Sequence, residues 1–372
     1  MKVLILSRSM GGGHNTAAKA MCEAFERRGV FAEMVDGAVF TTRFIKDASS
    51  YIYVKSVQRT PRLFGAVYKL GEVISTPRCK SVIYLANHKG AGRMFDYIKE
   101  NGFDAVVSPH LYPIETLTYL KRKKGLKIPC FGIATDYTCI PFWEDSEMDL
   151  YFIPSKELEG EYLNRKMDEK KLIPTGIPVS AKFKNKIPKE EAKRKLGLDE
   201  SSKYYLVMSG SMGAGNALEI SQNLLKYEKD CKPIVICGNN ARLYEKMKES
   251  LLNSAVVVGF TDKIELYMNA SEAVFTKAGG LTSTEAAVFG IPLVHTSPIP
   301  GCETENTEFF TEKGMSIHDD NPETLVKMAL KLTSDPSAVE RMVNLQAKYI
   351  NKDGADDIAD AVIKYVNKQK DR

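Results

Sequence analysis

The feature that most constrains this chain is an apolar strand that runs into a pair of glycines and then into a helix. Residues 273–275 are apolar, Gly279 and Gly280 follow, and a helix opened by Thr282 is predicted next. A glycine pair in this position lets backbone N–H groups approach a phosphate closely, at the positive end of the helix dipole. A buried strand joined directly to a helix is also the repeating unit of an α/β fold.

A carboxylate lies close behind the glycine pair. Glu285 can hold the vicinal hydroxyl groups of a sugar while the backbone holds phosphates, which is the chemistry of a nucleotide-sugar site. The spacing from Thr282 to Glu285 also fits a capping box, in which Glu285 only satisfies the start of the helix. Spacing alone supports the two interpretations about equally.

Strand, glycine loop and helix also follow one another elsewhere in the chain. Residues 2–7 form a buried strand, three glycines follow, and a helix is predicted from about 15 to 28. The spacing of the dinucleotide pattern G-x-G-x-x-G is absent there, so we expect no dinucleotide at this loop. After a strand at 204–209, another glycine loop can turn its N–H groups toward a diphosphate. The candidate contacts in that loop are Gly210, Ser211, Met212 and Gly213.

The number of such units predicts more than one domain. A chain of 372 residues exceeds one ordinary core. We place the junction near 180–187, which divides the chain into residues 1–182 and 183–355. The sequence therefore predicts an α/β fold of two doubly wound, Rossmann-like domains. The further buried strands are expected at 104–108, 129–135, 149–154, 171–175, 233–238 and 255–258.

His14 stands at the start of the first predicted helix. There the helix dipole disfavours the imidazolium, so the ring stays neutral near pH 7, as a general base requires. A histidine that only caps or packs is the commoner case, so the position alone does not assign a base. His110 and Asp136 each follow a predicted strand. Because ligands of doubly wound sheets bind beyond these strand ends, both side chains are expected to face the cleft.

Charge and composition narrow the class of protein. Residues 41–93 hold ten basic and two acidic residues, in a chain of net charge +5. The region also holds many aromatics, which suits docking on anionic lipid headgroups, although packing helices with solvated basic faces fit equally well. A solvated helix face better explains the basic run at 121–124. No apolar run has the length of a bilayer span, and the cysteines lack the pairing of a zinc site.

Long motifs in both halves resemble the diacylglycerol glycosyltransferases, the family of monogalactosyldiacylglycerol synthase and of the processive diacylglycerol glucosyltransferases. The N-terminal motif is G-G-G-H-x-x-A-A, which contains His14. The C-terminal motif is G-G-L-T-x-x-E-A, followed by G-I-P and P-I-P-G-x-E-x-E-N. The resemblance covers most of the chain and is strongest at 1–20 and 273–310. It implies the GT-B fold, in which two α/β domains face a cleft and the last helix, about 356–372, packs back on the first domain.

The resemblance also implies an activity, the inverting transfer of a hexose from a UDP-sugar to the hydroxyl of 1,2-diacylglycerol. In that scheme His14 removes the proton from the acceptor, and Asp136, in the family's Thr-Asp motif, positions the acceptor or the histidine. The resemblance also implies how the donor is bound. Phe260 and Thr261 are expected to contact the uracil, and Glu285 the ribose. The diphosphate is expected to contact the 210–213 loop together with Gly279, Gly280, Leu281 and Thr282, and Glu303 and Asn306 are expected to lie near the hexose.

Two departures from the family pattern leave part of this assignment open. Cys302 stands where the family has glutamine, so glucose and galactose both remain open as the hexose, with glucose favoured. Cys139 and Ile140 stand where the family often has a histidine, which leaves the role of that loop open. Two alternatives to the diacylglycerol enzyme also remain. One is a UDP-GlcNAc transferase acting on a polyprenyl-linked peptidoglycan precursor, which the P-I-P-G-x-E-x-E-N loop disfavours, and the other is a non-enzymatic UDP-sugar sensor.

The expected partners are a UDP-sugar donor, diacylglycerol or a related lipid acceptor, and an anionic membrane surface bound through residues 40–95, with no nucleic acid. No divalent metal and no other cofactor is expected, because the sequence has no compact Asp-x-Asp or histidine cluster and backbone N–H groups can stabilise the leaving diphosphate. A strand in place of a secretory signal predicts a cytoplasmic enzyme, peripheral on the inner face of the cell membrane.

Overall fold

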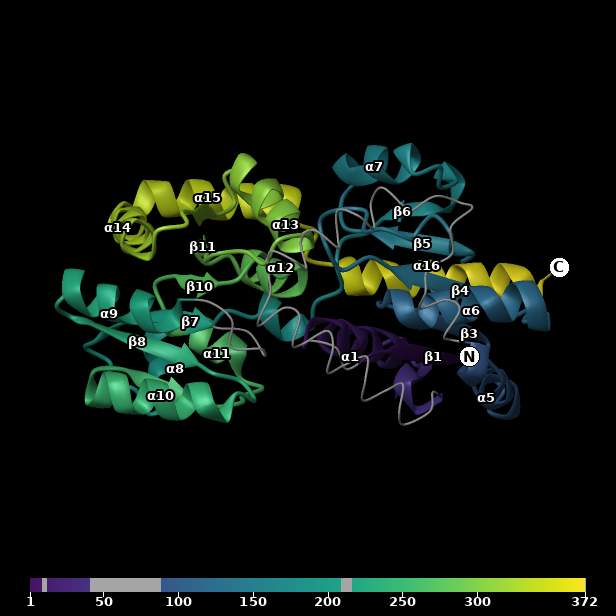
Figure 1. Ribbon diagram of the computed structural model, residues 1–372, viewed down its shortest axis with the longest axis horizontal. Coiled ribbons are helices and arrows are strands. Elements are labelled where there is room, and N and C mark those ends of the chain that lie inside the picture. The colour runs from purple at the N-terminus through teal and green to yellow at the C-terminus, as the bar shows by residue number, and fades with distance from the viewer. Residues whose placement is uncertain (9–11, 41–87, 209–215, 372) are drawn as a thin grey trace. The chain divides into compact units, whose positions relative to one another are not determined.

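The structure is a computed structural model that describes residues 1–8, 12–40, 88–208 and 216–371 (Figure 1). The chain divides into two compact units. The N-terminal unit comprises Met1–Ser180 and a returning segment, Asn351–Arg372, and the C-terminal unit comprises Ala181–Ile350. The sequence placed the junction at 182/183 and the return at about 356.

A parallel sheet of six strands forms the centre of the N-terminal unit. In chain order the strands are β1 (Lys2–Ser7), β2 (Phe31–Asp36), β3 (Ala105–Ser108), β4 (Cys130–Ile133), β5 (Leu150–Ile153) and β6 (Leu172–Pro174). Their order in the sheet is β2-β1-β3-β4-β5-β6. The central strands are buried runs of apolar residues, because helices cover both of their faces.

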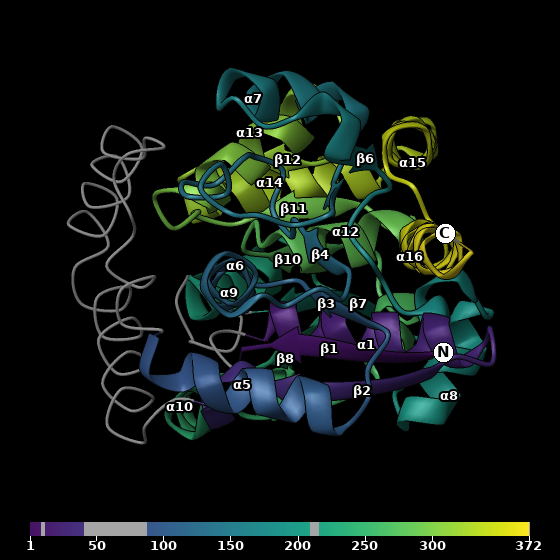
Figure 2. The ribbon, with the colours of Figure 1, turned by 90° about the vertical axis from the view of Figure 1, so that its right-hand side faces the viewer.

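The helices of this unit are α1 (Gly13–Glu26), α5 (His88–Glu100), α6 (Leu111–Lys124), α7 (Glu159–Asn164) and α16 (Gly354–Lys370). α1 and α16 pack together against one face of the sheet, where Ile5 and Val107 share a core with Phe25 and Ile358. α5 and α6 pack together, and Figure 2 shows them on the side of the sheet away from α16.

The C-terminal unit repeats this architecture on a second parallel sheet. Its strands are β7 (Lys203–Met208), β8 (Cys231–Ile236), β9 (Val256–Val258), β10 (Val274–Thr276), β11 (Leu293–His295) and β12 (Ile317–His318). Its helices are α8 (Lys189–Leu196), α9 (Ala217–Tyr227), α10 (Ala241–Leu251), α11 (Ile264–Asn269), α12 (Gly280–Phe289), α13 (Cys302–Glu312), α14 (Pro322–Thr333) and α15 (Pro336–Tyr349). The strand order is β12-β11-β10-β7-β8-β9. The predicted fold class, two doubly wound α/β domains, is confirmed.

Each sheet has a point at which its strand order reverses. In the N-terminal sheet this point lies between β1 and β3, and in the C-terminal sheet it lies between β7 and β10. The crossovers that leave the two strands run in opposite directions, so the loops at their carboxyl ends leave room for a ligand. His14 and His110 follow the first pair of strands, and the glycine pair at 279–280 follows β10. The topology thus places His14, His110 and the glycine pair at the two switch points.

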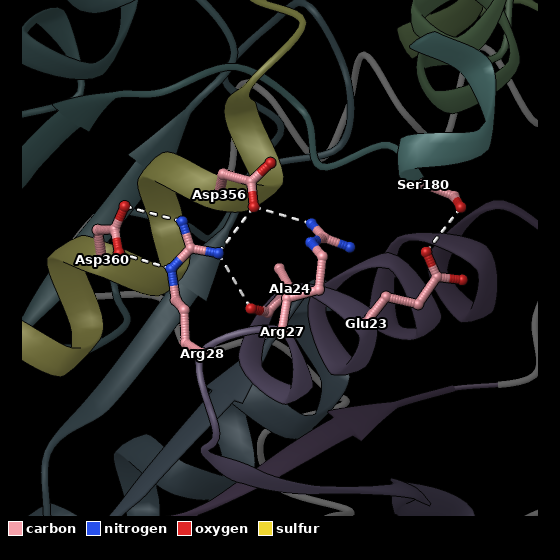
Figure 3. Close-up of polar contacts among 7 residues, drawn as sticks. All are labelled: Glu23, Ala24, Arg27, Arg28, Ser180, Asp356 and Asp360. Carbon is pink, nitrogen blue, oxygen red and sulfur yellow. Dashed lines mark hydrogen bonds and ion pairs between the residues drawn. The ribbon is translucent and has the colours of Figure 1, made fainter. Parts of the chain in front are cut away.

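The last helix, α16, is held in the N-terminal unit by ion pairs as well as by its apolar face (Figure 3). Arg28 donates to both carboxylate oxygens of Asp360, at 2.5 and 2.8 Å, and to Asp356 at 2.7 Å. Arg27 also donates to Asp356, at 2.8 Å. These contacts join α1 to a helix more than three hundred residues away along the chain.

The start of α16 approaches the backbone after β6 so closely that only glycine, which has no side chain, fits there. A Cβ atom at Gly354 would lie 2.9 Å from the carbonyl oxygen of Thr175 and 3.2 Å from that of Ile177. Asn351 closes the same junction, because its side-chain amide donates to the Thr175 carbonyl at 2.8 Å. Backbone contact therefore fixes where the returning segment enters the N-terminal unit.

The basic run at the end of α6 is partly neutralised by acidic neighbours. Lys121 pairs with Asp149 at 2.5 Å, and Arg122 pairs with Glu147 at 2.8 Å. These contacts support the simpler explanation of this run, a solvated helix face, over a binding patch.

Candidate active site

The carboxyl ends of three neighbouring strands bring the candidate base and its partners together. β1, β3 and β4 are adjacent and parallel, so their ends lie at the same edge of the N-terminal sheet. His14 follows β1, Pro109 and His110 follow β3, and Asp136 follows β4. Residues that are about a hundred positions apart in the chain therefore share one site.

A backbone carbonyl holds His14 in one tautomer. Its Nδ1 lies 2.9 Å from the carbonyl oxygen of Pro109, which can only accept, so Nδ1 carries the proton. The hydroxyl oxygen of Thr135 lies 3.2 Å from the same nitrogen and accepts from it. Nε2 keeps its lone pair, which is the arrangement that a general base needs.

The protonation of His14 is set mainly by burial. Burial lowers the pKa of His14, while Asp136 and the Pro109 carbonyl raise it in part. The ring is therefore neutral near pH 7, as the sequence predicted. The main cause is desolvation by the surrounding residues, and not the helix dipole that was expected from the position of His14 at a helix start.

His110 packs edge-on against His14, with 4.4 Å between the ring centroids and 64° between the ring planes. Its Nδ1 accepts from the backbone N–H of Tyr112 at 3.0 Å and so caps α6. Burial lowers the pKa of His110 well below its ordinary value, and the neighbouring His14 and Arg8 lower it further. Both rings of the pair are thus neutral, so His110 adds no charge beside the candidate base.

A small pocket adjoins His14. Its lining includes the apolar side chains Leu111, Ala134, Ile140 and Trp143, together with Thr135, Asp136 and Thr138. Ile140 is one of the residues at which the sequence departs from the family pattern, and it forms part of the apolar wall. A neutral imidazole beside an apolar wall suits an alcohol that is attached to a hydrocarbon chain.

A carboxylate from α7 holds the loop that forms this wall. Glu161 accepts from the hydroxyl of Thr138 at 3.0 Å and from the backbone N–H of Cys139 at 2.9 Å. The loop that carries Asp136 is therefore fixed by a residue outside it. Glu161 could not be identified from the sequence, because no local pattern indicates a contact between α7 and this loop.

In the C-terminal unit, the turn after β10 provides free backbone donors. α12 begins at Gly280 with Gly279 as its N-cap, and no side chain of the described residues caps it. The N–H groups of Gly280, Leu281 and Thr282 have no partner inside the helix, as at any helix start. The prediction that Thr282 opens the helix is wrong, and so is the capping-box explanation. Thr282 lies inside the first turn, so its spacing to Glu285 has no capping role.

Glu285 is buried on α12. Burial raises its pKa to about 8, Lys182 acts in the opposite direction and Glu265 raises the pKa further. Among the described residues, no hydrogen bond is made to its carboxyl group. Such a carboxyl group, beside free backbone donors, is what a site for ribose hydroxyl groups requires.

The acidic residues after β11 lie in a helix, not in a loop. α13 begins at Cys302, so the prediction that the loop extends to Glu303, Glu305 and Asn306 is wrong. The Pro-Gly sequence before the acidic residues suggested a loop, but the side chains of the first turn are held by tertiary contacts. Glu303 pairs with Lys277 and accepts from the backbone N–H of Ile299 at 3.0 Å.

Asn306 ties α13 to the glycine turn. It is buried, and its side-chain amide donates to the carbonyl of Ala278 at 2.9 Å, immediately before Gly279. A buried chain of hydrogen bonds also supports α12, because Ser283 and Ser316 contact the two ring nitrogens of His295 at 2.9 and 3.1 Å. Predicted donor-site residues and their supports are therefore clustered around one turn.

The candidate uracil loop follows β9. Phe260 is 70% exposed, so it is not a core aromatic. The hydroxyl of Thr261 accepts from the backbone N–H of Lys263 at 3.1 Å, which closes the loop before α11. The predicted diphosphate contacts Gly210, Ser211, Met212 and Gly213 lie outside the described residues, and so does most of the predicted membrane region at 40–95.

Two further properties concern only the part of the chain that the structure describes. Over residues 1–8, 12–40, 88–208 and 216–371, no three His, Cys, Asp or Glu side chains come together as a metal site would need. Over the same ranges, no helix combines the length and the apolar character of a membrane span.

Comparisons with known proteins match both halves of the chain. Residues 14–179 match the family described as monogalactosyldiacylglycerol (MGDG) synthase, and residues 188–352 match glycosyl transferases group 1. The processive diacylglycerol beta-glucosyltransferase of Bacillus subtilis is 26% identical over 347 residues, covering 92% of this chain and 89% of the relative. The protein of the same name from Bacillus cereus is 28% identical over 373 residues, covering 97% and 93%.

Solved structures share the fold. Acinetobacter baumannii MurG has a TM-score of 0.59 at 14% identity, covering 98% of this chain and 99% of that one. The UDP-GlcNAc 2-epimerase from Neisseria meningitidis, bound to UDP-GlcNAc, has a TM-score of 0.63 at 14% identity, covering 98% and 100%. These two likenesses concern the fold alone. The family matches and the curated relatives show that the chain is a glycosyltransferase with the GT-B fold, and that it is similar over nearly its whole length to the processive diacylglycerol glucosyltransferases.

Proposed function

We propose that this protein transfers glucose from UDP-glucose to the hydroxyl of 1,2-diacylglycerol, with inversion at the anomeric carbon. The observation that carries the proposal is the fixed tautomer of His14, whose Nδ1 is bonded to the Pro109 carbonyl beside an apolar pocket. Curated relatives over nearly the whole chain are named processive diacylglycerol beta-glucosyltransferases, which supports this acceptor and this sugar.

The chemistry is a single displacement. The acceptor oxygen forms a bond to the anomeric carbon as its proton passes to Nε2 of His14. The bond between the anomeric carbon and the diphosphate oxygen breaks, and UDP leaves with the electron pair. Asp136 faces the imidazolium that forms and stabilises it, because the opposite charge favours the protonated ring. One displacement at the anomeric carbon gives the β-glycoside from an α-linked donor.

The donor side of the proposal uses the C-terminal unit. Glu285 accepts from the ribose hydroxyl groups, and the loop with Phe260 and Thr261 contacts the uracil. Backbone N–H groups at 210–213 and at the start of α12 stabilise the charge on the leaving diphosphate, so the reaction proceeds without a divalent metal. Glu303, which holds the loop before α13 at Ile299, and Asn306, which holds the glycine turn at Ala278, lie near the hexose and the diphosphate.

The acceptor side of the proposal includes the membrane. Diacylglycerol resides in a bilayer, and the basic and aromatic residues of the 40–95 region suit docking on an anionic surface. We place the enzyme on the inner face of the cell membrane as a peripheral protein. Binding to vesicles with anionic lipid, and weak binding to neutral vesicles and to mixed DNA, is the expected result.

The decisive experiment replaces His14 by alanine. Purified protein is incubated with diacylglycerol and either UDP-glucose or UDP-galactose, in separate reactions, and the glycolipid product is measured by mass. With UDP-glucose we expect turnover to fall by about 10²–10⁴-fold while UDP binding is retained, because only the base is lost. If the unchanged protein makes glycolipid from UDP-galactose but not from UDP-glucose, the transferred sugar is galactose and not glucose.

His318→Ala is the matched control. His318 is also half-buried, and its Nδ1 also lies 2.9 Å from a backbone carbonyl, that of His295. Activity of this variant should stay close to that of the unchanged protein. Full activity of His14→Ala would remove the base assignment, and turnover of UDP-GlcNAc with a polyprenyl-linked acceptor alone would replace the proposed reaction.

A further inference from the structure

One lysine of the C-terminal unit joins three parts of the candidate nucleotide site. Lys182 lies in a short 3-10 helix, Ala181–Lys184, which packs against α12. Its ammonium group pairs with Glu265 on α11 at 2.8 Å. The same group donates to the backbone carbonyl of Asp262.

The contact to Asp262 bears on the candidate uracil loop. Asp262 directly follows Phe260 and Thr261, and the loop closes through the hydrogen bond from the Lys263 N–H to the Thr261 hydroxyl. A carbonyl that accepts from an ammonium group is fixed in direction, because this charge-assisted hydrogen bond is stronger than a neutral one. Lys182 therefore holds the end of the loop that presents Phe260.

The charge of Lys182 also acts on Glu285. Burial raises the pKa of Glu285 to about 8, Lys182 lowers it and Glu265 raises it. The remaining charged groups around α12 are engaged elsewhere. Lys186 donates to the carbonyl of Gly290 at the far end of the helix, and Lys277 pairs with Glu303.

A histidine also borders α12 but carries no charge. His295 on β11 contacts Ser283, and burial and His318 lower its pKa to about 3. The helix α15 contributes the neutral Gln346, which donates to the Ile291 carbonyl at 3.1 Å. Among the described residues, Lys182 and Glu265 are thus the charged groups that act on Glu285.

We propose that Lys182 is a positioning residue for the nucleotide, which fixes the uracil loop through Asp262 and presents its positive charge from beside α12 to the buried carboxyl group of Glu285. The proposal rests on the proposed function, in which Glu285 accepts from the ribose hydroxyl groups. An ionised carboxylate can accept from both hydroxyl groups at once, whereas a protonated one must use an oxygen as donor. Nucleoside affinity therefore depends on the ionisation of Glu285.

The direction in which nucleoside affinity changes with pH follows from the charges of Lys182 and Glu265. Affinity rises as pH increases through the pKa of Glu285, because the ionised form binds. Loss of Lys182 raises this pKa, so the midpoint moves to higher pH. Loss of the negative charge of Glu265 lowers it, so the midpoint moves to lower pH. Each unit of upward shift weakens binding about tenfold at any pH below the midpoint.

The experiment measures uridine and UDP affinity of the full-length protein between about pH 6 and pH 9. Uridine carries the ribose hydroxyl groups without a phosphate that titrates. We expect Lys182→Met to weaken binding most at neutral pH and to recover only in part at high pH, because the contact with the Asp262 carbonyl is lost at every pH. We expect Lys182→Arg to keep the original midpoint. Glu265→Gln should move the midpoint in the opposite direction.

Lys189→Met is the matched control. Lys189 pairs with Glu272 at 2.6 Å in the same unit, and its side chain is 34% exposed, against 39% for Lys182. This variant removes a comparable ion pair away from Glu285, so its pH midpoint should equal that of the unchanged protein. A general loss of stability from a broken ion pair would affect both lysine variants alike.

Glu285→Gln separates this proposal from the one on which it rests. If Glu285→Gln weakens binding and removes the pH dependence, while Lys182→Met or Glu265→Gln leaves the midpoint unmoved, the role of Lys182 is overturned and the ribose contact stands. A uniform loss of affinity in Lys182→Met at every pH, with the midpoint unmoved, would overturn the action of Lys182 on Glu285 and support its contact with the uracil loop. Unchanged affinity at every pH would overturn both roles. If Glu285→Gln binds uridine like the unchanged protein, the ribose assignment itself fails.

Discussion

Replacing Arg28 by methionine tests how the last helix is held in the N-terminal unit. The Arg28 side chain is 21% exposed, and its guanidinium binds the side chains of Asp356, 24% exposed, and Asp360, 65% exposed (Figure 3). The exposed pair with Asp360 is worth about 0.5 kcal/mol, in the range of surface ion pairs. The less exposed, charge-assisted contact with Asp356 adds about 1.5 kcal/mol. We therefore expect Arg28→Met to lower the free energy of unfolding by about 2 kcal/mol.

The assay is urea unfolding followed by tryptophan fluorescence. Trp143 is the only tryptophan of the chain, and it is buried in the N-terminal unit. Its signal therefore reports the unfolding of the unit that contains α16. Arg27→Met is the matched control, since it removes one pair from a guanidinium that is 40% exposed and should cost about 0.5 kcal/mol.

Apolar packing should exceed both effects. Ile358 on the same helix is fully buried, so Ile358→Ala should cost about 2–5 kcal/mol. The Arg28 effect should also shrink in about 1 M salt, which screens partly exposed pairs. The side chain of Arg28 holds the pKa of Asp360 below its ordinary value. The difference in the free energy of unfolding between Arg28→Met and the unchanged protein should therefore be largest above the ordinary pKa of aspartate. It should disappear as the pH falls through the lowered pKa of Asp360. Equal losses for the two arginine variants, or a loss below about 0.5 kcal/mol for Arg28→Met, would refute this account of α16.

Three further predictions concern the reaction. Asp136→Asn removes the charge that raises the pKa of His14, so the acid limb of the pH profile of kcat/KM should move to lower pH and the plateau should fall. An acid limb that does not move would contradict the assigned effect of Asp136 on His14. Glu161→Ala releases the loop that Glu161 holds through Thr138 and Cys139, so kcat/KM for the lipid should fall while UDP affinity stays constant. A parallel loss of UDP affinity would argue against this role of Glu161. Activity with the lipid acceptor should persist in excess EDTA, because backbone N–H groups stabilise the diphosphate; inhibition that added Mg²⁺ reverses would overturn the metal-free mechanism.

The strands were the part of the fold that the sequence predicted best. β1 matches its predicted bounds, and the other predicted strands lie within a few residues of theirs. Strands of a parallel sheet are covered on both faces, so they stand out as short, continuous apolar runs. The helix starts were less accurate, because Gly280 and Cys302 carry no local signal of a helix start and their helices are fixed by contacts made elsewhere in the fold.

In the candidate site too, some features could be predicted from the sequence and others depend on tertiary contacts. The chain order of strand, glycine turn and helix was enough to identify His14, Asp136 and Glu285 as candidates, because ligands of doubly wound sheets bind at strand ends. Only the tertiary structure could give the partner of each one. The Pro109 carbonyl that fixes the tautomer of His14 lies 95 positions away in the chain, and no local pattern links the two.

The amino-acid sequence by itself determined the α/β class, the positions of the buried strands and the residue types at the glycine turns, because these depend on local apolar patterns and backbone freedom. The tertiary structure decided which side chains meet, and through burial it decided their protonation. Glu285 and His14 differ from free residues because the folded chain removes water around them and places Lys182 and Asp136 nearby. Such effects depend on distances between remote segments, and those distances exist only once both sheets have formed.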